Sequence, residues 1–119
     1  MKYLFLLHSP DGPPQDSVSA EYAETFAAWA TVTAAMAEAG VLIDCGPLQP
    51  VSSATTVRVR GGRTILTDGP AAELREQIGG YTLVECADLD EALSWAARIP
   101  SAQTGWVDVR PVMATRASS

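Results

Sequence analysis

The chain has 119 residues, a mass of 12.6 kDa and a formal net charge of −6. A second hydrophobic core would need roughly 50 or more residues of its own, so we expect a single domain over residues 1–113 and a flexible polar tail over residues 114–119. The acidic balance disfavours phosphate backbones and anionic lipid as partners, and no apolar run approaches the roughly 20 residues that span a bilayer. We therefore expect a cytoplasmic protein with no nucleic-acid partner and no membrane partner.

The first half of the chain predicts two strands and a long helix. Residues 2–9 (KYLFLLHS) are apolar and end at a Pro/Gly-rich loop, which is typical of a strand. From residue 18 apolar side chains recur every three or four positions, which predicts a helix that ends at Gly40. Residues 41–48 (VLIDCGPL) predict the second strand. The apolar stripe of the helix comprises Tyr22, Phe26, Trp29, Val32 and Met36.

Residues 54–60 and 63–68 predict a β-hairpin. They alternate apolar and polar side chains on either side of two glycines, which suit a two-residue turn with positive φ. Val57 then pairs with Leu66 on one face, and the arginines at 58 and 60 project from the other face.

A small helix and a strand follow the hairpin. Pro70 fits the first turn of a helix over PAAELREQI, and the glycines at 79 and 80 end it. Residues 81–87 (YTLVECA) then predict a strand.

The C-terminal third predicts a helix and the last strand. Asp88 followed by Glu91 forms an acidic variant of the capping box at the start of DLDEALSWAARI. Pro100 ends this helix, and residues 105–113 (GWVDVRPVM) predict the final strand. The apolar face of the helix is expected to comprise Leu89, Ala92, Leu93 and Ala96.

This order of elements indicates a ferredoxin-like α+β fold, in which an antiparallel sheet carries its helices on one face. Because side chains alternate along a strand, the residues expected on the opposite face can be identified. They are Lys2, Leu4, Leu6, His8, Tyr81, Leu83, Glu85, Trp106, Asp108 and Arg110. An apolar patch of this size marks an interface or a pocket, so we expect a homodimer whose two sheets close a shell around a cavity for a small molecule.

The chain resembles the YCII-related superfamily, in the branch with a DGPF-type motif. The segments that carry the resemblance are MKYLFLLH, GVLIDCGPL, ATTVRVRGGRTILTDGP, GGYTLVECADLDEALSWAARIP and VDVRPV. At the motif, Ala71 stands where the family usually has Phe, and Leu74 replaces the usual Thr. The resemblance implies a dimeric α+β barrel, and its members often occur near genes for alternative sigma factors.

His8, the only histidine, is the candidate catalytic acid or base. Other YCII-like proteins are thought to use a His and Asp pair, on a fold similar to that of muconolactone isomerase. The long first helix of this chain contains no histidine, so a role for His8 is our own hypothesis. Its orienting carboxylate could be Asp68, Glu85 or Asp11. The alternative is a strand-end histidine that is bonded to a loop carbonyl.

Arg110 is the main candidate for binding a ligand, because its planar guanidinium can hold a carboxylate through two hydrogen bonds. Its alternative role is an ion pair with Glu85 or Asp108. The TDGP segment also has two interpretations, because Asp68 could simply accept backbone N–H groups at a turn, or the helix start near Gly69 could bind an anion. The further ligand-binding candidates are Tyr81, Glu85, Asp108 and Trp106.

Cys45 and Cys86 lie in predicted strands and lack metal-ligand spacing, so we expect two reduced thiols. One histidine without spaced carboxylates falls short of a ligand set, and we expect neither a metal nor a cofactor. Three functions stay open. They are a homodimer that binds a small anionic metabolite, a cofactor-independent isomerase or lyase that uses His8, and a protein-interaction module linked to transcription.

Overall fold

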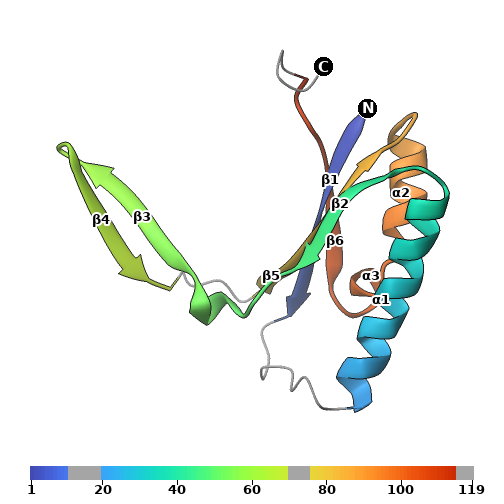
Figure 1. Cartoon of the computed structure of the whole chain (residues 1–119), viewed down its shortest axis with the longest axis horizontal. Helices are drawn as coiled ribbons and strands as arrows, with labels where there is room; N and C mark the ends of the chain where they lie inside the picture. The colour runs from blue at the N-terminus through green and yellow to red at the C-terminus, as the bar shows by residue number, and fades with distance from the viewer. Residues whose placement is uncertain (11–19, 70–75, 115–119) are drawn as a thin grey trace.

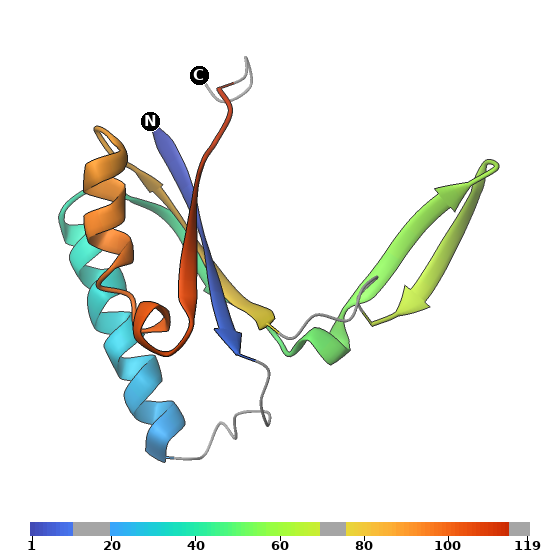
Figure 2. The ribbon, with the colours of Figure 1, turned by 180° about the vertical axis from the view of Figure 1, so that it is seen from behind.

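The computed structural model describes residues 1–10, 20–69 and 76–114. Its elements in chain order are β1 (Lys2–Pro10), α1 (Ala20–Glu38), β2 (Leu42–Pro47), a 3₁₀ turn (Val51–Ser53), β3 (Thr55–Arg60), β4 (Arg63–Asp68), β5 (Glu76–Glu85), α2 (Leu89–Ala96), α3 (Ser101–Thr104) and β6 (Trp106–Pro111). Four strands form an antiparallel sheet in the order β2-β5-β1-β6, and β3 and β4 form a separate hairpin. The helices lie on one face of the sheet (Figures 1 and 2). The ferredoxin-like α+β fold is therefore confirmed, with the hairpin inserted between β2 and β5.

The core lies between the sheet and its helices, and the alternation of β1 and β5 determines which side chains enter it. Phe5 and Val84 have no exposed surface, and Thr82 is also fully buried. This confirms the predicted assignment of the two faces. The other buried apolar residues are Tyr3, Leu7, Val32, Met36, Cys86, Ala92, Ala96 and Ile99.

The predicted capping box begins α2. The side chain of Asp88 accepts a hydrogen bond of 2.9 Å from the backbone N–H of Glu91, and Oε1 of Glu91 accepts one of 3.0 Å from the N–H of Ala87. These two bonds satisfy backbone donors that the first helical turn leaves free. Gly40, after α1, has a φ of 78°, as the predicted left-handed cap requires.

The apolar faces of the two long helices are narrower than predicted. Leu89 and Leu93 are each 46% exposed, because the small side chains of Ala92 and Ala96 make the contact of α2 with the sheet. Phe26 is also 46% exposed, and the N-terminal half of α1 extends past the end of the sheet (Figure 1). The side chain of Tyr22 lies outside the described part.

The predicted small helix is wrong where the structure describes it. Residues 70–75 lie outside the described part, but β5 already begins at Glu76, and Gly79 and Gly80 lie inside this strand rather than at a helix end. The reason is tertiary, since β5 pairs with β1 on one side and with β2 on the other. A Cβ atom at Gly80 would lie 3.0 Å from the carbonyl oxygen of Gly46, so the close approach of the two strands requires glycine.

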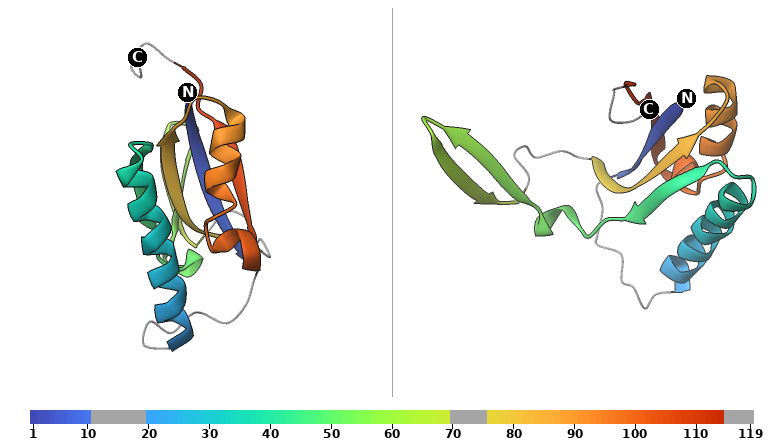
Figure 3. Two further views of the ribbon diagram at one scale, coloured as in Figure 1. Left: turned by 90° about the vertical axis from the view of Figure 1, so that its right-hand side faces the viewer. Right: turned by 45° about the horizontal axis from the view of Figure 1, so that its top comes forward.

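The β3–β4 hairpin has the predicted register. Val57 pairs with Leu66 and Val59 with Thr64, and the turn glycines at 61 and 62 have φ values of 57° and 76°. The hairpin stands away from the four-stranded sheet, on the side opposite to the helices (Figures 1 and 3). Its apolar side chains are therefore left without a covering layer in the single chain.

Candidate functional site

The candidate site is the sheet face that the helices leave open, which we call the uncovered face. Directly paired residues of antiparallel strands point to the same side, so the registers of β1 with β5 and β6 define three rows across this face. Each row runs from β5 through β1 to β6. The rows are Leu83, Leu4 and Arg110; Tyr81, Leu6 and Asp108; and Ile78, His8 and Trp106.

His8 lies in a cluster with two residues of β6. Its Nε2 atom is 2.9 Å from Oδ2 of Asp108, and its side chain is only 13% exposed. The imidazole stacks on Trp106, with 5.2 Å between ring centroids and an interplanar angle of 11°. Neither ring nitrogen has a well-aligned hydrogen bond within the described residues, so the loop carbonyl that we considered as an alternative partner is not found there.

A β-bulge shapes the end of the face where His8 lies. Leu7 pairs with Gly80 but His8 pairs with Ile78, so Gly79 is an extra residue on β5. In a regular ladder Ile78 would share the helix-covered side with Gly80, because side chains alternate. The bulge turns Ile78 toward the side of His8. This places an apolar neighbour beside the imidazole.

The carboxylate beside His8 is not one of those expected. Asp68 ends β4 opposite Thr55, in a different sheet from His8. Glu85 pairs with Lys2 at the other end of β1, about 20 Å from His8 at ~3.3 Å per residue. Asp11 lies outside the described residues. Asp108, which we had assigned to ligand binding, takes this place because the β1–β6 register sets it diagonally across from the imidazole.

Arg110 is exposed and lies one row from Asp108 on the uncovered face. Within the described residues it forms no ion pair with Glu85 or Asp108, which were its expected partners in the structural alternative. Glu85 instead lies 3.4 Å from the N-terminal amine, measured from its Oε2 atom. Among the described residues, neither of these carboxylates therefore occupies the guanidinium of Arg110.

Tyr81 has a partner that we did not predict from the sequence. Its hydroxyl donates a hydrogen bond of 3.1 Å to Oδ2 of Asp44, on the neighbouring strand β2. The pKa of Tyr81 is raised, mainly because of this hydrogen bond. A Cβ atom at Gly46 would lie 3.2 Å from Cε1 of Tyr81, so glycine leaves room for the ring. The sequence contains one signal for this contact, which is the polar Asp44 within the predicted strand VLIDCGPL.

Gly69, which we considered as part of an anion site at a helix start, uses both of its backbone groups within the hairpin, and the residues after it lie outside the described part. Its N–H donates to the carbonyl of Ala54 at 2.6 Å, and its own carbonyl accepts from the hydroxyl of Thr56 at 2.7 Å. Its φ of 87° requires glycine. Gly69 therefore closes the base of the hairpin, which favours the structural interpretation of the TDGP segment.

The two thiols are free, as predicted. Burial is the main cause that raises the pKa of Cys86 to about 11, and a hydrogen bond with Glu91 adds to it. Burial also raises the pKa of Cys45. Both side chains are therefore protonated at neutral pH, and a thiolate nucleophile is not favoured.

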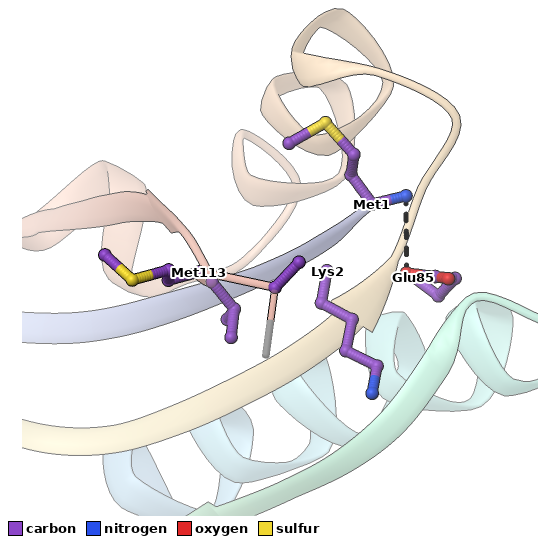
Figure 4. Close-up of a pocket in the computed structure, with 6 residues that line it drawn as sticks. Met1, Lys2, Glu85 and Met113 are labelled. Carbon is purple, nitrogen blue, oxygen red and sulfur yellow. Dashed lines mark ion pairs between the residues drawn. The ribbon is translucent and has the colours of Figure 1, made fainter. Parts of the chain in front are cut away.

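A shallow hollow lies at the end of the sheet opposite to His8. It has a volume of about 220 Å³ and is lined by Met1, Lys2, Glu85, Val112, Met113 and Ala114. Figure 4 shows the N-terminal amine beside Glu85 at its rim. The hollow is smaller than ligand pockets of about 300–1,000 Å³. A ligand of ordinary size would need more walls than this end of one chain supplies.

Two further properties concern only the residues that the structure describes. No cluster of three or more His, Cys, Asp or Glu side chains is placed to hold a metal ion among them. No described helix has the length and the apolar character to cross a membrane.

Three comparisons place the chain among known proteins. Residues 1–116 match the YCII-related domain. An uncharacterised protein of Rhizobium meliloti (strain 1021) is 46% identical over 77 residues, which cover 63% of this chain and 62% of that protein. The match thus spans less than two thirds of the length of this relative.

Among solved structures, the chain is similar to 5-chloro-2-hydroxyhydroquinone dehydrochlorinase (TftG) from Burkholderia phenoliruptrix AC1100, in complex with 2,5-dihydroxybenzoquinone. The TM-score is 0.53 and the identity 16%, with full coverage of both chains. At this identity the likeness shows the shared fold and no shared activity. Because the family match extends over almost the whole sequence, the chain belongs to the YCII-related domain family.

Proposed function

We propose that the uncovered face binds a small anionic metabolite, in a cavity that a second copy of the chain completes. The observation that supports this is the position of Arg110 and of the His8–Asp108 pair among apolar side chains on an open sheet face. Small-molecule sites combine apolar walls with a few well-placed polar groups. Arg110 supplies the cation for a carboxylate or an acidic hydroxyl, and Trp106, 39% exposed, supplies a flat apolar surface.

A second copy of the chain accounts for the wall that one chain lacks. The leucines at positions 4, 6 and 83 are only partly buried in the single chain. Two uncovered faces packed across a two-fold axis would remove these side chains from water and enclose the charged groups. Enclosed charges have to be paired or bound to a ligand, which favours an anion as the occupant.

Proton transfer is a second candidate function, and the 2.9 Å contact between His8 and Asp108 supports it. A carboxylate beside one imidazole nitrogen orients the ring and leaves the other nitrogen to act as a base. This corresponds to a cofactor-independent isomerase or lyase.

Ligand titration tests the binding proposal. Suitable probes are 2,5-dihydroxybenzoquinone, the compound bound in the TftG structure, together with simple aromatic and aliphatic carboxylates, followed through the indole N–H signal of Trp106 by NMR. We expect saturable binding that becomes about 10-fold weaker in Arg110→Ala, since a hydrogen bond to a charged group is lost. Arg98→Ala is the matched control, because Arg98 stacks on Trp95 of α2, on the helix side. Equal weakening in both variants, or no response to any probe, would contradict the proposal.

The proton-transfer candidate has its own test. We expect the protein to accelerate the uptake of solvent deuterium at acidic C–H groups of small carbonyl acids, and His8→Gln to abolish this effect. Asp108→Ala should reduce the rate and also change the tautomer of His8, which ¹H–¹⁵N correlation spectra report. Unchanged deuterium uptake in His8→Gln would exclude His8 as the base.

A further inference from the structure

The β3–β4 hairpin carries an apolar face that the single chain leaves in water. Val57 is 61% exposed, Val59 is 59% exposed and Leu66 is 67% exposed. The register places all three on the same side of the hairpin. An isolated two-stranded hairpin is at best marginally stable in water and needs a packing partner. Six residues of each strand are regularly paired. We therefore expect another surface to cover the apolar side of this hairpin.

The opposite side of the hairpin is cationic. Arg58, Arg60 and Arg63 lie there, and they are three of the eight Lys and Arg residues of an otherwise acidic chain. The uncovered face of the sheet is mainly apolar at its centre, where Leu4, Leu6 and Leu83 are partly exposed, and it carries side chains of both charges. The apolar side of the hairpin therefore matches the apolar part of the uncovered face of a second copy, and the arginine side stays in contact with water.

The surface area of the chain points to the same partner. The single chain exposes 8363 Å², whereas a compact protein of 12.6 kDa exposes about 6,200 Å². The excess is larger than the ~800 Å² that each partner buries in an interface of standard size. A dimer that buried the exposed side of the hairpin as well as the sheet would reduce this excess.

We propose that the β3–β4 hairpin is an arm that each copy of the chain extends to the other. In the homodimer, the face formed by Val57, Val59 and Leu66 packs on the uncovered face of the partner subunit, and the arginine side of the arm points away from that contact. The arm thereby supplies a wall of the cavity in which we place the ligand. This inference rests on the proposed function for the position of that cavity, but its test measures assembly and not ligand binding.

Leu66 and Ile65 are neighbours that point to opposite sides of the arm, which provides a matched pair of variants. We expect wild-type protein to sediment with twice the mass of one chain and Leu66→Asp to raise the dimer dissociation constant by roughly 100-fold. Ile65→Asp, which introduces the same charge on the arginine side, should remain a dimer. Circular dichroism and thermal melting confirm that each variant keeps the folded sheet and helices.

A second measurement uses the unmodified protein and does not depend on the folding of any variant. In a mixture of isotope-labelled and unlabelled chains, isotope-filtered NOE spectra should connect the methyl groups of Leu66 with leucine methyls of the uncovered face or with Trp106 of the partner subunit. Cross-peaks confined to one chain would overturn the proposal.

Other results would also overturn it. They are a monomeric wild-type protein, a Leu66→Asp variant that stays dimeric, or equal dissociation of both variants. A monomer that binds a short fluorescent DNA duplex, and loses this binding when the three arginines are replaced, would assign the arm to nucleic acid. A dimer with the expected contacts that binds none of the anionic probes would instead leave the arm in place and refute the proposed function.

Discussion

The four-stranded sheet and the β3–β4 hairpin are built from the same kind of sequence but differ in burial. Both alternate apolar and polar residues and both have regular antiparallel pairing. In the sheet, Phe5 and Val84 are completely buried, whereas the least exposed large apolar residue of the hairpin, Ile65, is 44% exposed. Backbone pairing alone therefore defines the shape of a hairpin, and a covering layer provides most of the free energy that stabilises it.

The largest expected effect is on the free energy of unfolding, and it should differ between a substitution in the sheet and one in the hairpin. Phe5→Ala should lower the free energy of unfolding by about 3–5 kcal/mol, because it removes a buried ring and leaves a cavity. Leu66→Ala should change it by no more than about 0.5 kcal/mol in the isolated chain, because Leu66 is already exposed there. Urea unfolding followed by circular dichroism, at concentrations where the protein is monomeric, measures both. Similar losses in the two variants would mean that the hairpin packs on its own chain.

The free energy of unfolding should depend on pH because of the buried thiol of Cys86. The pKa of Cys86 is raised from 9.0 to about 11 in the folded protein, so the unfolded chain loses this proton at lower pH than the folded chain does. Stability due to the neutral thiol is therefore present below pH 9 and is lost between pH 9 and 11, by an amount on the order of 2 kcal/mol.

Chemical unfolding at several pH values measures this loss. The dependence should be strongly reduced in Cys86→Ala, and it should largely persist in Cys45→Ala, because Cys86 is buried whereas Cys45 is only partly buried. An unchanged pH dependence in Cys86→Ala would show that other groups cause it.

The smallest expected effect on stability comes from a substitution in the hairpin turn, and it should be confined to the hairpin. Gly62 has a φ of 76° and open space around its Cβ position, so Gly62→Ala should cost about 1 kcal/mol through backbone conformation alone. Hydrogen exchange should accelerate at the amides of β3 and β4 and not at those of β1. Gly79→Ala is the control, because its Cβ position is also open and its φ is not positive. Acceleration across the sheet would contradict the independence of the two regions.

Much of the fold could be predicted because its signals are local. The period of two in β1 and β5 identified the side chains that enter the core, and the double glycine at 61 and 62 identified the hairpin register. The capping box at Asp88 identified the start of α2. The error at Glu76–Ile78 has the opposite cause, since a segment with helical signals pairs instead with distant strands.

The candidate site was predictable as a face but not as a set of contacts. Alternation placed His8, Asp108 and Arg110 on one side of the sheet, which the structure bears out. The choice of Asp108 over Asp68 and Glu85 as the neighbour of His8 depends on which residues of β1 and β6 lie opposite one another. No local pattern encodes that register.

The sequence by itself therefore determined the two faces of the sheet, the hairpin and its turn, and the family to which the chain belongs. Only the tertiary structure decided that His8 meets Asp108, that Tyr81 meets Asp44, and that the hairpin stands apart with its apolar side exposed. The physical reason is that periodicity and turn chemistry act over a few neighbouring residues. Cross-strand contacts and burial depend on segments that are far apart in the chain.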